Sequence, residues 1–155
     1  MGKVEFKNNI VVVQDLLKET AIKFLNEVGG ELTAQVQRNT KVDTGQLKGS
    51  WKYVVDEGDL KVIIGSPLQN AIWEEFGTGE YAKDGRKTAW FVPEDAIKGG
   101  KSKPTYNGKV VVVYGKNGKK FYKTNGKKPK RALQTAYEKT KPKIERRLET
   151  LMKGN

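Results

Sequence analysis

The most regular pattern of apolar positions lies in the first quarter of the chain. Between residues 15 and 39, apolar side chains recur every three or four positions, which places them on one stripe of an α-helix. The stripe comprises Leu17, Ala21, Phe24, Leu25, Val28, Leu32 and Val36. Gly29 and Gly30 interrupt it, so we expect either a bend there or a neighbour packed closely against bare backbone. Upstream, the pattern predicts one or two short strands, formed by Val4, Phe6 and Ile10–Val13.

Two later stretches are typical of β-hairpins. The segments 50–55 and 60–65 flank Asp56-Glu57-Gly58-Asp59, whose acidic and glycine residues suit a four-residue connection. The segments 109–114 and 119–124 flank a turn that contains Asn117-Gly118, and Asn-Gly supplies the positive φ angles of a tight turn. We therefore predict two antiparallel strand pairs.

Helical spacing returns on both sides of the second hairpin. Residues 67–76 predict a short helix that ends at Gly77, and the apolar spacing from Pro129 onward predicts a C-terminal helix that Pro142 kinks or splits. Residues 80–107 predict a long loop with a brief extended segment at 89–93. The expected fold is α+β, a single domain over residues 1–155. A small antiparallel sheet from the two hairpins packs against the N-terminal and C-terminal helices, with a basic loop and hairpin inserted at about 80–128.

Composition removes several classes of function. The 155-residue chain contains no cysteine and no histidine, so it has no disulfide, no thiolate nucleophile, no zinc site of the usual kind and no imidazole base. Its apolar runs are far shorter than the roughly 18 residues of a membrane-spanning helix. Lys3, Glu5 and Lys7 interrupt any apolar core of a secretion signal. We expect a soluble, intracellular chain without a membrane partner.

The positive charge is concentrated in one segment. Residues 1–79 carry 9 basic and 11 acidic side chains, a net charge of −2, whereas residues 80–131 carry 15 and 4, a net charge of +11. Residues 132–155 add a net charge of +3. Such a segment favours contact with a polyanion or an acidic protein surface, and a solvated lysine-rich insertion explains it equally well.

Within that segment we select eight candidate residues for contact with DNA or with an acidic partner. They are Lys116, Lys119, Lys120, Lys123, Lys127, Lys128, Lys130 and Arg131. Trp90 and Phe91 could stack on bases, but we expect one ring to anchor the loop to the core and the other to be half exposed.

Carboxylates are the remaining candidates for chemistry. Glu74 and Glu75 are adjacent, so on a helix they point about 100° apart and do not share a site. We expect one to be solvated and the other to pair with a lysine. A metal-dependent hydrolase or nuclease would need these two together with Asp43 and Asp56, whose spacings match no metal-ligand pattern. Gly77-Thr78-Gly79 lacks the flanking residues of a phosphate-binding loop.

A turn precedes the first hairpin. Asp43 can accept a hydrogen bond from a backbone N–H at the start of a short helical turn, with Gln46 at the reciprocal position of a capping box.

Two successive sequence motifs resemble those of a family of long-tailed bacteriophage and prophage morphogenesis proteins. These proteins are called minor tail, tail-completion, neck or head–tail joining proteins. The first is carried by Asp43, Thr44, Gly45, Leu47 and Ser50, and the second by Ala71, Glu75, Phe76, Gly77 and Thr78. Pro129 and Arg131-Ala132 loosely match a third motif that introduces the last helix. The two better motifs span about a quarter of the chain.

The resemblance implies a structural assembly protein, not an enzyme, with no cofactor. Members of this family act in the virion, at the neck or the head-proximal end of the tail, after assembly in the host cytoplasm. The implied partners are further copies of the chain in a ring around the DNA channel, other phage neck or tail proteins, and DNA through nonspecific contact. Both motifs would then be structural. A separate nucleic-acid-binding module, built on residues 109–131, remains the alternative.

Overall fold

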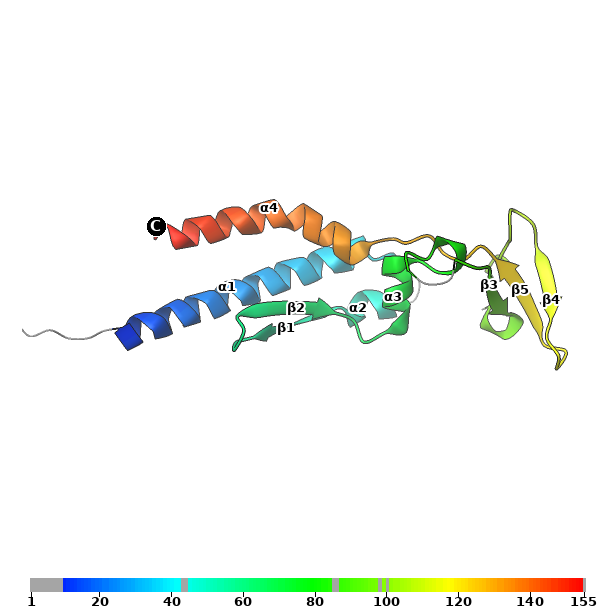
Figure 1. The fold of residues 1–155 in the computed structure, drawn as a ribbon, viewed down its shortest axis with the longest axis horizontal. Helices are drawn as coiled ribbons and strands as arrows, with labels where there is room; N and C mark the ends of the chain where they lie inside the picture. The colour runs from blue at the N-terminus through cyan, green and yellow to red at the C-terminus, as the bar shows by residue number, and fades with distance from the viewer. Residues whose placement is uncertain (1–9, 43–44, 85–86, 98, 100, 155) are drawn as a thin grey trace, which may run out of the picture. The chain divides into compact units, whose positions relative to one another are not determined.

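The computed structural model describes residues 10–42, 45–84, 87–97, 99 and 101–154 (Figure 1). Its contacts divide the chain into two compact units. Unit 1 contains residues up to Ser66 together with Ala136 onward, and unit 2 contains Pro67–Thr135. The single domain over residues 1–155 stays a prediction.

Unit 1 is organised around one long helix. Helix α1 spans Ile10–Asn39, so the predicted strand at Ile10–Val13 is wrong, while Val4 and Phe6 lie outside the described residues. A short run of consecutive apolar residues lacks the alternation of a half-buried strand, and it fits a helix equally well. The helix continues through both glycines.

A two-stranded hairpin packs on α1. Strand β1 (Lys52–Asp56) pairs antiparallel with β2 (Lys61–Gly65), as predicted. A Cβ atom added to Gly29 would lie 2.3 Å from Cδ2 of Tyr53, so close packing is the reason for that glycine. The core of the unit is formed by Val28, Leu32, Val36, Trp51 and Ala136.

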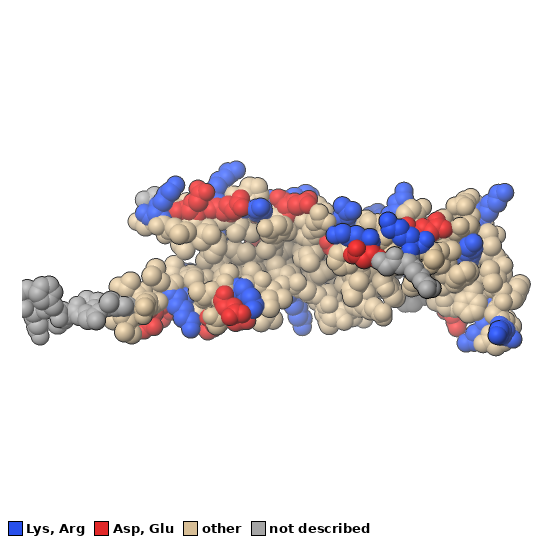
Figure 2. Space-filling model, in the orientation of Figure 1, with Lys and Arg blue, Asp and Glu red and all other residues tan. Residues whose placement is uncertain are grey.

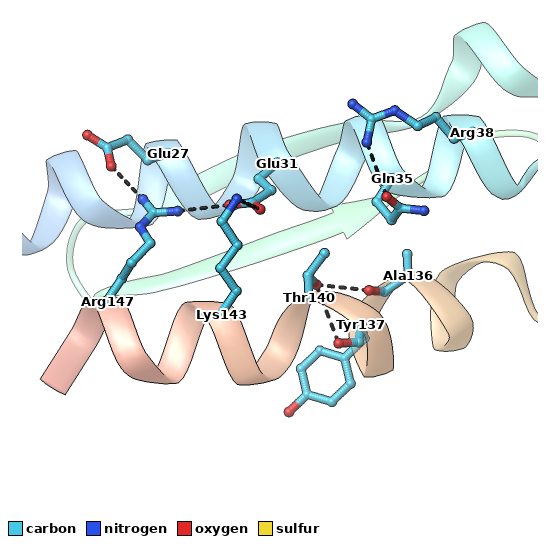
Figure 3. Close-up of polar contacts among 9 residues, drawn as sticks. All are labelled: Glu27, Glu31, Gln35, Arg38, Ala136, Tyr137, Thr140, Lys143 and Arg147. Carbon is cyan, nitrogen blue, oxygen red and sulfur yellow. Dashed lines mark hydrogen bonds and ion pairs between the residues drawn. The ribbon is translucent and has the colours of Figure 1, made fainter.

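Helix α4 (Ala132–Met152) lies along α1 and runs through Pro142 as one element (Figure 3). Three ion pairs join the two helices. Arg147 contacts Glu27 at 2.6 Å and Glu31 at 2.8 Å, and Lys143 contacts Glu31 at 2.6 Å. These two cations lower the pKa of the Glu31 carboxyl, with the Lys143 hydrogen bond the largest cause. These ion pairs therefore help to hold α4 beside α1, and Ala136 of α4 is fully buried.

Unit 2 contains a second, separate sheet. Strands β3 (Trp90–Pro93), β5 (Lys120–Thr124) and β4 (Val111–Tyr114) are antiparallel and lie in the order β3-β5-β4. Helix α3 (Gln69–Phe76) and the short 3-10 turns Gly79–Tyr81 and Glu94–Ala96 complete the unit. The α+β class is confirmed. The two hairpins, however, form two separate sheets and not the single small sheet predicted, and the second sheet gains a third strand because the extended segment predicted at 89–93 pairs with β5.

The two aromatic residues of β3 meet the expectation in part, because Phe91 is half exposed but Trp90 is not buried in the core. Trp90 is 42% exposed and Phe91 is 48% exposed, so neither ring is buried. Trp90 instead makes an edge-to-face contact with Trp73 of α3, with ring centroids 6.2 Å apart. The buried ring at the centre of this sheet is that of Tyr122, on β5.

Candidate functional site

The second sequence motif lies in a compact hydrogen-bonded arrangement within unit 2. Residues 74–80 run beside residues 125–134, and we call these two segments together the clasp. Thr78 N–H donates to the Lys127 carbonyl at 2.9 Å, and Glu80 N–H donates to the Asn125 carbonyl at 2.8 Å. Lys127 N–H in turn donates to the Thr78 hydroxyl at 2.9 Å. The motif therefore fixes the chain segment that leads into α4.

Glu75 is the buried acid of the clasp. Its side chain accepts hydrogen bonds from Leu133 N–H and Gln134 N–H, both at 2.9 Å. These N–H groups belong to the first turn of α4, where no partner exists within the helix and where a negative charge is favoured. Glu75 thus caps α4 from a distant position in the sequence, which corrects the expectation of a solvated carboxylate.

Glu74 supplies two further contacts. Its carboxylate forms an ion pair with Lys127, which confirms the expected lysine pair. Its backbone carbonyl accepts hydrogen bonds from Lys130 N–H at 2.6 Å and from Arg131 N–H at 3.3 Å. Arg131 adopts a positive φ of 52°, in the left-handed region, immediately before α4 begins. Side chain and backbone of Glu74 therefore hold both ends of this turn.

The glycines of the clasp are required by close backbone approach. A Cβ atom at Gly79 would lie 2.5 Å from the Asn125 carbonyl oxygen, and one at Gly126 would lie 2.1 Å from the Thr78 carbonyl oxygen. Gly77 follows α3 with a φ of 78°, and a Cβ atom added there would lie 2.8 Å from the Lys127 carbonyl oxygen. The Gly-Thr-Gly sequence thus packs backbone against backbone and leaves no room for a phosphate.

Phe76 is not part of the core, since it is 43% exposed and Lys83 Nζ lies 5.8 Å from its ring centroid. Its neighbours on α3 are also open to solvent: Ile72 is 58% exposed and Trp73 is 38% exposed. The helix buries Ala71 and Glu75 instead.

The first motif shapes the start of the unit 1 hairpin. Asp43 and Thr44 lie outside the described residues. Helix α2 (Gln46–Ser50) confirms the helical turn, but its N-cap is Gly45, with φ 79° and no side-chain cap. Gln46 is the first residue of the helix, and the predicted capping box falls on Asp43, outside the described residues, so it stays a prediction.

Ser50 is the residue of this motif with the clearest contacts. Its hydroxyl donates to the Leu47 carbonyl at 2.7 Å and lies 2.7 Å from the hydroxyl of Ser66. It thereby ties the entry of β1 to the exit of β2, next to buried Trp51. Both motifs thus contain residues that fix the ends of helices or strands.

The eight basic candidates do not form one cluster. Lys116 and Lys119 lie in the turn between β4 and β5, whereas Lys127, Lys128, Lys130 and Arg131 follow the other end of β5. A five-residue strand separates the two groups by roughly 17 Å. On the face drawn in Figure 2, Lys and Arg are interspersed with Asp and Glu in this region.

Several of these cations have partners within unit 2. Lys120 donates to Glu94 at 2.8 Å, which lowers the pKa of Glu94 and raises that of Lys120. Lys123 lies 4.0 Å from the Tyr106 ring centroid, and Lys128 lies 5.5 Å from that of Tyr81. Lys116 and Lys119 of the turn are exposed.

The carboxylates that a hydrolase would need have structural contacts. Asp56 accepts hydrogen bonds from Asp59 N–H at 3.1 Å and from Gly58 N–H at 3.0 Å. Its pKa is lowered by the bond from Asp59, by Lys61 and by the bond from Gly58. In the clasp, Glu74 pairs with Lys127 and Glu75 accepts two backbone hydrogen bonds. Asp43 lies outside the described residues. Among the described residues, no group of three or more acidic side chains is placed to hold a metal ion.

Sequence reasoning missed the cap on α4 and the ion pairs between α1 and α4. One signal was available for the cap: the residues before Ala132 are Lys130 and Arg131, and neither is a helix-capping type. A helix without its own cap requires an acceptor from elsewhere in the chain. The ion pairs join residues 112 to 120 positions apart, and no local pattern reports them.

Comparison with known proteins gives one match. Residues 5–77 match the model of the HK97-gp10-like family, described as "Bacteriophage HK97-gp10, putative tail-component". The resemblance to phage tail proteins is confirmed over this segment, which contains the first motif and the second as far as Gly77. Neither the curated proteins nor the solved structures gave a match. In the described part of the chain, no helix has both the length and the apolar character needed to cross a membrane.

Proposed function

We propose that this chain, matched over residues 5–77 by a family of phage tail components, is a structural subunit of the virion that acts in tail completion or head–tail joining. In this role it is not an enzyme and needs no cofactor. It is assembled in the host cytoplasm into a ring around the DNA channel, beside other neck or tail proteins. The family match carries this proposal, because it coincides with the motifs that fix the hairpin and α4.

The contacts of the motif residues support a structural role. Glu75 is only 9% exposed, and its carboxylate is occupied by two backbone N–H groups. A catalytic carboxylate needs access to substrate, which this one lacks. Gly79 and Gly126 are likewise occupied by backbone packing.

Deletion of the gene from the phage tests the function directly. We expect full heads and separate tails, or tails of abnormal length, in electron micrographs of the lysate. Wild-type protein supplied from a plasmid should restore joined particles. Normal infectious particles from the deletion phage would overturn the proposal.

Contact with DNA in the channel is the second element of the proposal. The exposed turn lysines Lys116 and Lys119 support it, because long cations on a turn reach phosphates at little desolvation cost. Filter binding of duplex DNA at two salt concentrations measures the contact. Each lost phosphate contact should lower the salt slope by about 0.9, so Lys116→Gln with Lys119→Gln should lower it by about 2. An unchanged slope would show that Lys116 and Lys119 do not contact DNA phosphates and would overturn this element of the proposal.

A further inference from the structure

The first turns of α1 carry an apolar stripe that nothing in the described part of unit 1 covers. Val12 is 57% exposed, Val13 51%, Leu16 57% and Leu17 65%. At about 100° per residue these four side chains occupy less than half of the helix circumference. We call them the α1 stripe. In Figure 1, this end of α1 extends past the tip of the hairpin.

A second apolar surface lies on the same unit. Tyr53 faces α1 at Gly29, so the next residue of β1, Val54, points to the opposite face of the hairpin. Val54 is 66% exposed, and its partner across the strands, Ile63, is 55% exposed. Lys52 precedes this pair on the same face. We call Lys52, Val54 and Ile63 the hairpin outer face.

We propose that the α1 stripe of one copy packs on the hairpin outer face of the next copy. Within one chain α1 already packs on the inner face of this hairpin, so the outer face would receive a helix in the same manner. This inference rests on the proposed ring and names the surfaces that form it. Because two different surfaces meet, the contact is head to tail, and such contacts close into rings when the rotation permits.

Charge favours this occupant over a stripe paired with another stripe. Asp15 and Glu19 border the α1 stripe, and neither forms an ion pair with a described residue. Two stripes packed together would bring these like charges close to one another. The hairpin outer face instead offers Lys52, whose ammonium group has no carboxylate partner among the residues described. Opposite charges at the rim of an interface fix its register and orientation.

The area sets the strength of the contact. Six apolar side chains that are each half to two-thirds exposed correspond to about 300–400 Å² of apolar surface. That area is below the roughly 1,000 Å² of a stable interface. We therefore expect dilute subunits to remain monomeric and the contact to hold when several copies close a ring.

Disulfide trapping tests the contact in full-length protein, because the natural chain contains no cysteine. The variants Leu16→Cys and Ile63→Cys are purified separately, mixed at high concentration and oxidised. The mixture should give cross-linked dimers about tenfold faster than either variant alone. A chain that carries both substitutions should give a ladder of dimers, trimers and larger species, and the dimers of the mixture should stop at two copies.

A matched control uses Gln14→Cys, on the opposite side of the same helix turns, mixed with Ile63→Cys. This pair should cross-link no faster than the single variants. Fast cross-linking by Leu16→Cys alone would show that stripe pairs with stripe, and equal rates in every mixture would show no specific contact. Either result overturns the inference.

Charge reversal gives an independent readout. Adding Glu19→Lys to the Leu16→Cys chain should slow cross-linking several-fold, and Lys52→Glu on the Ile63→Cys chain should restore it. No loss, or loss without restoration, counts against this pairing. Failure of these tests alongside failed tail assembly in the deletion phage would reject the surfaces and leave the proposed function standing.

Discussion

The two units of the molecule are stabilised in different ways. Unit 1 buries large apolar side chains, among them Leu32, Val36 and Trp51, between a helix and a hairpin. The clasp of unit 2 is held by backbone hydrogen bonds, a buried carboxylate and glycines in direct backbone contact. Apolar packing tolerates changes that conserve volume, whereas backbone-to-backbone contact tolerates no added atom. Substitutions in the clasp, which contains the second motif, should therefore destabilise the protein more than volume-conserving substitutions in the core of unit 1.

The largest expected effect is a single methyl group in the clasp. Gly126→Ala places a Cβ atom at 2.1 Å from the Thr78 carbonyl oxygen, at a φ of 100°. Neither backbone can withdraw without breaking the ladder between the two segments, so we expect a loss of about 3 kcal/mol or more in the free energy of unfolding. Urea denaturation measures it, followed by tryptophan fluorescence in a Trp51→Phe background so that only Trp73 and Trp90 of unit 2 emit.

Gly118→Ala is the control for backbone strain alone. Gly118 has a φ of 72°, and an added Cβ atom meets nothing within 4 Å. It should cost about 1 kcal/mol, the penalty of the left-handed conformation. Equal losses in the two variants would mean that close approach in the clasp has no special weight.

The paired glycines of α1 should respond with opposite signs. Gly29→Ala drives a Cβ atom into the Tyr53 ring and should cost about 2–3 kcal/mol, because ring and hairpin must move away. Gly30→Ala meets nothing within 4 Å and should stabilise the helix by up to about 1 kcal/mol. Thermal unfolding followed by circular dichroism compares them. Stabilisation by both substitutions would show that helix propensity, and not packing, governs Gly29.

Removal of the buried charge tests the cap. Glu75→Gln retains one acceptor oxygen and loses the negative charge at the start of α4, so we expect a loss of about 1–2 kcal/mol. Amide exchange at Leu133 and Gln134 should accelerate in this variant. The exposed Glu145→Gln on the same helix should change stability by less than about 0.5 kcal/mol. Unchanged exchange at the two amides would remove Glu75 from this role.

The smallest effect concerns the ion pairs between α1 and α4. The pKa of Glu31 is lowered from its ordinary value of 4.5, so its stabilisation is present above that pH and is lost as pH falls through the lower folded pKa. Glu31→Gln should cost up to about 1 kcal/mol at pH 7 and low salt. The difference from wild type should vanish at acidic pH and shrink in 1 M salt. A difference that is constant from pH 7 to pH 3 would contradict this.

Local patterns predicted most elements of the fold. Both hairpins, helix α3 with its end at Gly77, and the C-terminal helix are confirmed because their signals lie within a few residues of the structure they specify. The run Ile10–Val13 failed because continuous apolar residues carry no period. The third strand of the second sheet was seen as an extended segment, but its partner could not be predicted because pairing depends on distant residues.

The sequence motif selected residues of the clasp, but the contacts that these residues make could not be predicted. The motif selected Glu75, Gly77 and Thr78, but their partners lie about 50 positions downstream, outside the segment that matches the phage family. The basic candidates lie at both ends of β5, and Glu94 and Glu74 pair with two of them, Lys120 and Lys127. Residue type gives charge, and only the fold decides whether that charge is already engaged.

The distance in sequence between α1 and α4 sets an order of events during synthesis. Glu31 leaves the ribosome 112 residues before Lys143, its partner. At about 5–20 residues per second, Glu31 is synthesised about 6–22 seconds before Lys143. During that time the charged Glu27 and Glu31 keep this side of α1 hydrated. Their like charges oppose association between nascent chains that are translated from the same mRNA. The three ion pairs form only after Arg147 has been synthesised, so a product that stops before Lys143 leaves Glu27 and Glu31 without these partners.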